Sequence, residues 1–199
     1  MKILLVGATG RLGAALSATL AQRGHQVLGA SRKHTDQHVD ISNCATIAAL
    51  YERIGSIDAV VCAAGSTPYK PLHQLTHDDY LTGFHNKALG QIDLVRLGLS
   101  SIAPRGSFTL TTGVLAREPI VTSAAASAAN GAVEAFVRAA ALEAAPVRVN
   151  AVSPTVITEA LEQYADFFPG IEPVPLERVV QAYIRSIEGA ETGRIFALG

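Results

Sequence analysis

Residues 2–13 read KILLVGATGRLG: four apolar residues run into a glycine-rich turn that opens a helical stretch. Glycines allow a tight turn and a close approach of the backbone to a ligand. The free N–H groups at the start of the following helix form a site for a pyrophosphate. A plain strand-to-helix turn is the alternative. We expect the cofactor contacts of this turn to be Gly7, Thr9, Gly10, Arg11, Leu12 and Gly13.

Short apolar runs alternate with longer helical stretches along the rest of the chain. Strands are expected at 3–6, 27–30, 58–62, 107–112, 147–152 and 194–198, with a short extended piece at 38–41. Helices are expected at 12–20, from Ser42 or Asn43 to Ile54, at 78–99 with an interruption near Gly83 and Gly90, and at 123–145 and 176–187. The pattern predicts an α/β fold: one Rossmann-like domain over 1–199, a doubly wound parallel sheet in three α/β/α layers.

The composition excludes several classes of protein. The chain has 199 residues, 49% hydrophobic and 17% charged, with a net charge of −1. It is therefore too apolar for a disordered chain and carries no basic excess for nucleic acid. No apolar run reaches the roughly 20 residues that span a bilayer, the start leaves no room for a signal peptide, and two cysteines suggest neither a disulfide framework nor a metal site. We expect a cytoplasmic protein with a small-molecule substrate, no nucleic-acid or membrane partner and no metal.

The end of the second strand bears on which dinucleotide binds. Binders of NAD usually carry an acidic residue there, about 20 residues beyond the glycine motif. This chain has Ser31, Arg32 and Lys33 instead. The Ser31 hydroxyl and the Arg32 guanidinium suit a 2′-phosphate, and Arg11 would add a second cation. The sequence favours NADP(H) over NAD(H), with a solvated basic loop as the alternative.

Several motifs together resemble the short-chain dehydrogenase/reductase family over nearly the whole chain. Residues 148–154, RVNAVSP, resemble its R-V-N-x-[IV]-x-P-G segment, and 192–193 its T-G ending. The resemblance implies that Asp40 meets the adenine and that Ile157 and Thr158, after Pro154, hold the nicotinamide carboxamide. It also implies that Ala63, Ala64 and Gly65, at the family's N-N-A-G motif, support the sheet and ribose.

The family's catalytic residues do not match. Its tyrosine and lysine, four residues apart, fall on Ala126 and Asn130, and its serine falls on Thr112 or Gly113. The family's helix asparagine falls on Lys87, next to Asn86.

These departures leave two hypotheses open. In the first, the chain is an atypical oxidoreductase in which Lys87 is the proton donor, or binds the ribose, and Thr112 and Asn86 complete the catalytic set. Lys87 as a surface lysine and Thr112 as an ordinary strand end are the alternatives. Tyr69 and Tyr164 lie in segments that we expect to overhang the cleft. A purely packing role for the two tyrosines is the alternative. In the second hypothesis, the chain is a non-catalytic dinucleotide sensor or scaffold.

The helix expected at 123–145 is rich in alanine on every side, which permits close approach of another helix. In relatives, this helix and the preceding long one, here 78–99, form a four-helix interface. The resemblance therefore implies a homodimer or homotetramer. Packing of the alanines onto the sheet is the alternative, and it explains only one face of the helix.

Overall fold

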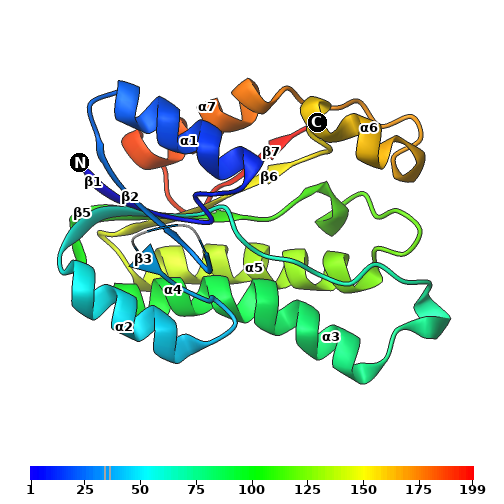
Figure 1. Cartoon of the computed structure of the whole chain (residues 1–199), viewed down its shortest axis with the longest axis horizontal. Coiled ribbons are helices and arrows are strands. Elements are labelled where there is room, and N and C mark those ends of the chain that lie inside the picture. The colour runs from blue at the N-terminus through cyan, green and yellow to red at the C-terminus, as the bar shows by residue number, and fades with distance from the viewer. Residues whose placement is uncertain (34, 36) are drawn as a thin grey trace.

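The computed structural model describes residues 1–33, 35 and 37–199, which form one parallel seven-stranded sheet between two layers of helices (Figure 1). The strand order is β3-β2-β1-β4-β5-β6-β7, and every neighbouring pair is parallel. The strands are β1 (Lys2–Val6), β2 (Gln26–Ser31), β3 (Gln37–His38), β4 (Ile57–Cys62), β5 (Ile102–Thr111), β6 (Arg148–Pro154) and β7 (Ile195–Leu198). The predicted Rossmann-like, doubly wound fold is confirmed.

The helices are joined by shorter 3-10 and π-helical segments. They are α1 (Arg11–Gln22), α2 (Cys44–Ile54), α3 (His77–Gly83), α4 (Gly90–Gly98), α5 (Ala124–Glu143), α6 (Leu161–Tyr164) and α7 (Leu176–Glu188). The shorter segments are η1 (Leu72–Gln74), η2 (Phe84–Leu89), η3 (Val114–Ala116), η4 (Thr158–Ala160) and η5 (Ala165–Phe167), of which η2 is π-helical. No helix of the described residues is both long and apolar enough to cross a membrane.

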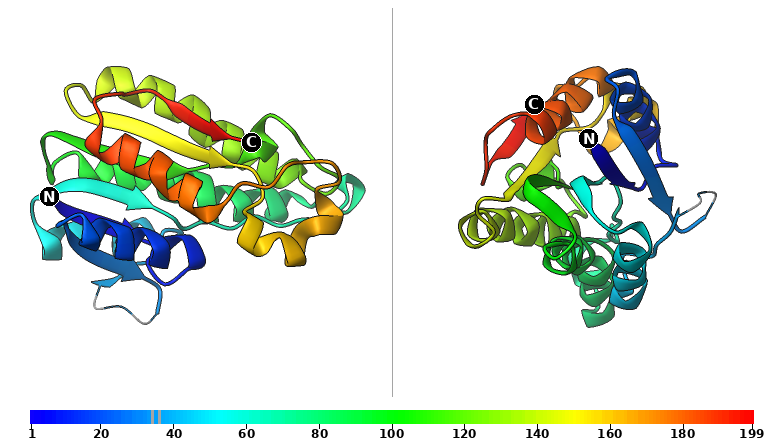
Figure 2. Two further views of the ribbon diagram at one scale, coloured as in Figure 1. Left: turned by 90° about the horizontal axis from the view of Figure 1, so that it is seen from above. Right: turned by 90° about the vertical axis from the view of Figure 1, so that its left-hand side faces the viewer.

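Alternating side chains of the strands build a separate core on each face of the sheet. On β1, Leu4 and Val6 pack toward α2, α4 and α5, whereas Ile3 and Leu5 pack toward α1 and α7. Figure 2 shows the twisted sheet edge-on between these layers. Because the strand order reverses between β1 and β4, the carboxyl ends of these two strands flank the point where such sheets bind ligands.

The long helix expected at 78–99 is present as three joined segments, α3, η2 and α4. The residues directly after its π-helical segment are held by two different parts of the fold. A Cβ on Gly90 would lie 2.5 Å from the Ile41 carbonyl oxygen, so this helix passes directly over the loop after β3. The buried Gln91 side chain donates to the Thr111 carbonyl at 2.9 Å and accepts from the Thr111 N–H at 2.7 Å. The π-helical segment is thereby fixed above the ends of β4 and β5.

Two segments differ from the sequence-based expectation. The extended piece predicted at 38–41 is a strand only at its start, because Asp40 turns toward α2: its N–H donates to Thr46 Oγ1 at 3.0 Å. Of the two predicted caps of α2, Ser42 and Asn43, the structure has Asn43, whose side chain accepts from the Ala45 N–H. Between β6 and α7 the chain also forms η4, α6 and η5. These segments were not predicted, because the sequence there has no long periodic pattern.

Candidate functional site

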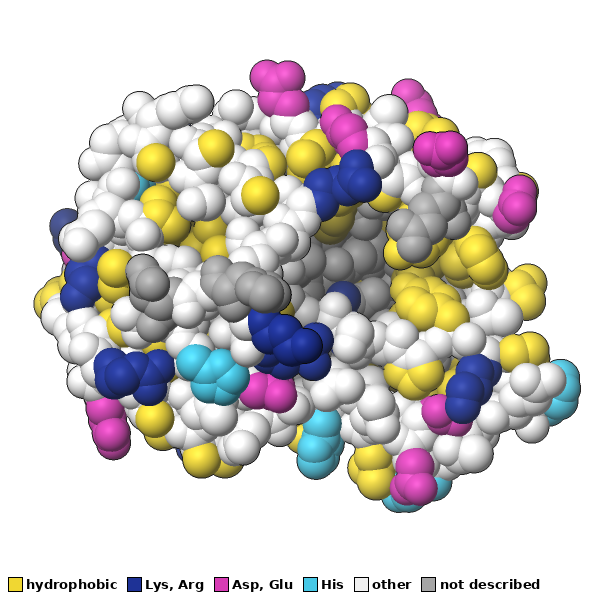
Figure 3. Space-filling view, viewed as in Figure 1, with side chains coloured by type: hydrophobic (Ala, Val, Ile, Leu, Met, Phe, Trp, Pro, Cys, Tyr) yellow, Lys and Arg dark blue, Asp and Glu magenta, His cyan; other side chains and the backbone are white. Residues whose placement is uncertain are grey.

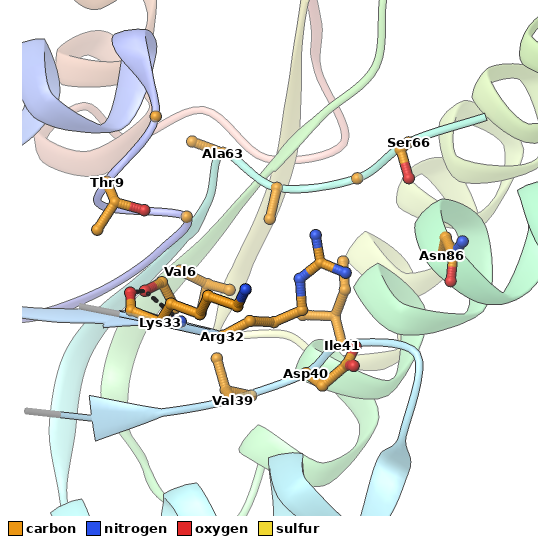
Figure 4. Close-up of a pocket in the computed structure, with 15 residues that line it drawn as sticks. Val6, Thr9, Arg32, Lys33, Val39, Asp40, Ile41, Ala63, Ser66 and Asn86 are labelled. Carbon is orange, nitrogen blue, oxygen red and sulfur yellow. Dashed lines mark hydrogen bonds between the residues drawn. The ribbon is translucent and has the colours of Figure 1, made fainter. Parts of the chain in front are cut away.

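A cavity of about 630 Å³ runs along the carboxyl ends of β1, β2 and β4 (Figure 4). This volume lies within the range of ligand sites, about 300–1,000 Å³. Figure 3 shows the hollow on this face, with Lys and Arg side chains on its left and upper margins and hydrophobic side chains on its right. The lining residues are Val6, Gly7, Thr9, Gly10, Ser31, Arg32, Lys33, Val39, Asp40, Ile41, Ala63, Ala64, Gly65, Ser66 and Asn86.

The glycine turn has a geometry that side chains would destroy. Gly7 has φ +87°, and a Cβ on it would lie 2.8 Å from the carbonyl carbon of Ala63. A Cβ on Gly13 would lie 2.1 Å from the Gly7 carbonyl oxygen, so Gly13 lets α1 begin directly against β1. The first-turn N–H groups of α1 therefore end beside the cavity, where an anion can accept from them. This cradle fits the pyrophosphate of a dinucleotide.

The basic residues after β2 face this cavity. Figure 4 shows the side chains of Arg32 and Lys33 reaching across it, with Ser66 and Asn86 on the opposite side. The Asp40 carboxylate accepts from the N–H and the hydroxyl of Ser42, and this hydroxyl contact, aided by the Arg32 charge, holds the pKa of Asp40 below its usual range. Asp40 lines the cavity and also stabilises the turn before α2, while its contact with the adenine stays a prediction.

Two predicted phosphate ligands are engaged elsewhere in the structure. The Arg11 guanidinium donates to the carbonyl of Glu159, in η4, and Arg11 is absent from the described cavity lining. The Arg11 side chain thus spans from α1 to η4, and its role as a second cation for the 2′-phosphate stays a prediction. The Ser31 hydroxyl lines the cavity but donates to the Lys33 carbonyl, so it shapes the basic loop. Leu12 and Gly13 lie in the first turn of α1 and are not part of the cavity lining, so they would contribute to phosphate binding only through the backbone of this helix.

Lys87 lies in the π-helical segment, against the glycine turn that follows β4. A Cβ on Gly65 would lie 3.0 Å from Lys87 Cγ, and the Ser66 N–H donates to the Asn86 carbonyl at 3.4 Å. Burial lowers the pKa of Lys87 to about 8, partly opposed by the nearby Cys62 thiol. Among the described residues, the Lys87 ammonium has no hydrogen-bond or ion-pair partner. Its stem packs on a residue that lines the cavity, while Asn86 itself is part of the lining.

Thr112 belongs to a buried polar cluster below the cavity. Its hydroxyl donates to Glu134 Oε1 at 3.1 Å, and Ser153 and Arg117 donate to the same oxygen at 3.1 and 2.9 Å. Thr112 is 3% exposed and lines neither described cavity. The structure thus places the predicted catalytic hydroxyl against Glu134, a partner on α5 that lies 22 residues away in the sequence.

The two residues that the sequence aligns with the family's tyrosine and lysine, Ala126 and Asn130, are both buried on α5. Ala126, 2% exposed, packs with Val114 and Leu115, and Phe168 covers the same cluster. The space around Ala126 is therefore filled by hydrocarbon. Asn130 is 3% exposed, and its Oδ1 has no hydrogen-bond partner among the described residues. Neither residue lines a described cavity.

A second cavity, of about 410 Å³ and called the apolar cavity below, lies along the segment after β6. A parallel bridge pairs Ile157 with Val174: the Thr158 N–H donates to the Val174 carbonyl and the Val174 N–H to the Val156 carbonyl, each at 2.9 Å. This pairing turns the Ile157 N–H away from Val174. Pro154 and Thr158 line neither cavity. The apolar cavity is lined by Tyr69, Ile120, Val156, Ile157, Ala160, Tyr164, Phe167 and Phe168.

Sequence reasoning missed several residues of these sites. Val6, Val39, Ile41 and Ser66 line the first cavity because they flank the strand ends, a position that the strand predictions imply. Phe167 and Phe168 were missed because their segment lacks a helical or strand period long enough to read. Tyr69 and Tyr164, from segments expected to overhang the cleft, both line the apolar cavity. No group of three His, Cys, Asp or Glu residues converges in the described parts of the chain.

Comparison with known proteins places these features in a family. Residues 10–182 match the family model described as enoyl-(acyl carrier protein) reductase. The vibriobactin-specific 2,3-dihydro-2,3-dihydroxybenzoate dehydrogenase of Vibrio cholerae is 26% identical over 188 residues, covering 81% of this chain and 72% of the relative. The short-chain dehydrogenase/reductase ucsE of an Acremonium species is 30% identical over 104 residues, which cover 51% of this chain and 39% of the relative. The chain thus matches about two fifths of the length of that relative.

Solved structures are similar over almost the entire chain. The protein lin1944 from Listeria innocua is 43% identical with a TM-score of 0.96, covering 99% of this chain and 98% of that one. A small-chain dehydrogenase in complex with NADPH is 26% identical with a TM-score of 0.88, covering 99% and 95%.

Proposed function

Since the chain belongs to the short-chain dehydrogenase/reductase family, we propose that it is an NADP(H)-dependent oxidoreductase acting on a small carbonyl compound or alcohol. One observation carries the proposal furthest. The stem of Lys87 packs against the Gly65 turn of the cofactor cavity, and its amine, with its pKa lowered to about 8, has no partner among the described residues. An amine in this state can donate a proton near neutral pH and accept one at slightly higher pH.

The first cavity would hold the dinucleotide. The glycine turn and the start of α1 bind the pyrophosphate, and Arg32 and Lys33 bind the 2′-phosphate. The Ile157 N–H, turned away from Val174, donates to the nicotinamide carboxamide, in line with the family resemblance. When bound, the nicotinamide supplies or receives the hydride. The similarity to a dehydrogenase in complex with NADPH supports the choice of NADP(H).

Lys87 is the proposed proton donor for carbonyl reduction. With a pKa of about 8, Lys87 is mostly protonated at pH 7, so its Nζ donates a proton to the substrate oxygen as the alcohol forms. In the reverse direction, the neutral amine accepts the hydroxyl proton. Asn86, in the cavity lining, orients the substrate or the ribose. Thr112 has no part in this scheme, because its hydroxyl already donates a hydrogen bond to the Glu134 carboxylate.

The proposal includes a homodimer or homotetramer in the cytoplasm, assembled through α4 and α5 and the segments that precede α4. Exposed apolar side chains on these elements support such an interface: Leu142 is 83% exposed and Leu89 is 43% exposed. Light scattering of wild type and Leu142→Glu tests it. A smaller assembly in the variant is the expected result, and a monomeric wild type contradicts it.

Calorimetric titration with NADPH, NADP⁺, NADH and NAD⁺ tests the cofactor proposal. Wild type should bind the two phosphorylated forms more tightly. Arg32→Ala should weaken them by about 10- to 100-fold, the loss of a charge-assisted hydrogen bond worth about 1.5–3 kcal/mol, and leave NADH unaffected. Arg105→Ala is the matched control, since Arg105 is exposed near the start of β5, away from the cavity. Equal binding of NADPH and NADH by wild type would contradict the preference.

A non-catalytic dinucleotide sensor is the second candidate function, favoured by the hydrocarbon packing around Ala126. Turnover measurements separate the two functions. If the chain is an enzyme, NADPH oxidation with some carbonyl compound falls by about 10²- to 10⁴-fold in Lys87→Ala and less in Asn130→Ala. Lys70→Ala, an exposed lysine paired with Asp79, is the control. Tight dinucleotide binding without turnover of any carbonyl compound would favour the sensor.

A further inference from the structure

The lining of the apolar cavity selects against charge. Its eight described lining residues are aliphatic or aromatic, and the two tyrosine hydroxyls are the polar groups of their side chains. Transfer of a carboxylate or phosphate into such surroundings without a cation costs several kcal/mol or more. Burial raises the pKa of Tyr69, which keeps its phenol neutral. A neutral phenol donates a hydrogen bond to a carbonyl oxygen without demanding a charged partner.

Aromatic rings gather at the mouth of this cavity. Tyr69 is 52% exposed, Phe167 is 49% exposed and Tyr164 is 42% exposed. Large apolar side chains that cluster at the surface mark an interaction site, whereas single ones are ordinary. Aromatic side chains prefer to stack offset or edge-to-face with another ring. The exposed rings therefore suit a flat, ring-shaped ligand better than a flexible chain.

Two features support a position of the apolar cavity next to the cofactor cavity. Ser66 lines the first cavity and Tyr69 the second, and three residues of chain span at most about 11 Å. Ile157 lines the apolar cavity, while its N–H, which has no partner among the described residues, is the proposed contact of the nicotinamide carboxamide. A ligand in the apolar cavity would thus lie at the reactive end of the cofactor, not at its adenine end.

The volume sets the size of the ligand. The cavity of about 410 Å³ equals about 14 water molecules, at about 30 Å³ each. It therefore has room for a ligand of at least about ten to fourteen non-hydrogen atoms, which corresponds to two fused rings.

We propose that the apolar cavity binds the reacting substrate, and that this substrate is an uncharged bicyclic aromatic ketone or the corresponding alcohol. The inference deepens the proposed function and rests on it for the reaction, though not for the binding. In reduction, the ketone carbon gains a hydride from NADPH and its oxygen gains the Lys87 proton, so that the products are the alcohol and NADP⁺. Water then returns a proton to Lys87.

Calorimetry with 1-tetralone, an uncharged bicyclic ketone, tests the binding on the full chain. The ring-matched anion 1-naphthoate tests the selection against charge. Ala160→Phe fills the apolar cavity from η4, and Ala18→Phe, on the exposed side of α1, is the matched control. We expect wild type to bind 1-tetralone at least tenfold more tightly than 1-naphthoate. Ala160→Phe should weaken the binding of 1-tetralone at least tenfold, whereas Ala18→Phe should not. In both variants the affinity for NADPH should stay within twofold of wild type.

The outcomes separate the two proposals. Equal affinity for the ketone and the anion, or unchanged 1-tetralone binding in Ala160→Phe, overturns the substrate class. A change in the size of the assembly caused by Ala160→Phe, seen by light scattering, also overturns it, because a second copy of the chain would then cover the cavity. If 1-tetralone binds as expected but NADPH does not bind, the binding inference stands and the proposed oxidoreductase function fails.

Discussion

Replacing Lys87 by methionine should stabilise the protein while removing its proposed proton donor. Methionine keeps the length and flexibility of the side chain but not its charge. Burial lowers the pKa of Lys87 from 10.5 to about 8, so the folded protein holds this ammonium at a cost. The difference of about 2.5 pH units corresponds to about 3.5 kcal/mol, at about 1.4 kcal/mol per unit. Because the residue is partly exposed to solvent, screening reduces the expected gain to about 2 kcal/mol.

The gain depends on pH with a definite sign. Between pH 8 and 10.5 the unfolded chain binds more protons at this position than the folded chain, so the stability of wild type rises with pH. Lys87→Met lacks this contribution. Its advantage in the free energy of unfolding should therefore be fully present at pH 7, shrink above pH 8 and approach zero near pH 10.5.

Urea and thermal unfolding of both proteins from pH 7 to pH 10 measure this difference. For a chain of 199 residues, about 2 kcal/mol corresponds to a rise in Tm of about 4–8 °C at pH 7. Lys33→Met is the control, because Lys33 is exposed and its replacement should leave Tm within about 2 °C. A Lys87→Met protein no more stable than wild type at pH 7, or a gain that stays constant to pH 10, would refute the reasoning.

Two further predictions concern the reaction and the cofactor turn. The rate of carbonyl reduction should fall as pH rises through about 8, because reduction needs the charged Lys87. The rate of alcohol oxidation should rise over the same range, because oxidation needs the neutral Lys87. Steady-state kinetics should show this ionisation in wild type and not in Lys87→Ala. Gly13→Ala should cost about 1–3 kcal/mol of stability and weaken NADPH, since its Cβ would lie 2.1 Å from the Gly7 carbonyl oxygen. Gly131→Ala, where a Cβ meets nothing within 4 Å, should be neutral or stabilising in the same unfolding and binding measurements.

The fold was predictable because its signal is local and repeated. Most apolar strands are followed by a helical period, and the glycine turn at Gly7 fixes where the first strand ends. The basic residues of the first cavity were also predictable, since Arg32 and Lys33 directly follow β2. The short extended piece at 38–41 was misjudged because a hydrogen bond from Asp40 to Thr46, six residues away, outweighs the weak strand pattern.

The directions of side chains could not be predicted, because they depend on partners far away in the sequence. Arg11 contacts the carbonyl of Glu159, 148 residues away, and Thr112 donates to Glu134, 22 residues away. Both residues are correctly placed at the carboxyl edge of the sheet. Their side chains nevertheless turn away from the described cavity lining, toward groups that sequence periodicity does not bring together.

The π-helical segment explains how a lysine can take over a role near the cofactor. A π-helical turn inserts a residue into an α-helix and changes which side chains face a given neighbour, and such turns are frequent at functional sites. Here the turn is held on one side by Gly90 against Ile41 and by Gln91 against Thr111, and its Lys87 packs on Gly65. Meanwhile α5 carries an alanine at the family's tyrosine position, in hydrocarbon surroundings. The proton-transferring group has thus moved, in our proposal, from α5 to the segment between α3 and α4, which leaves α5 free to pack.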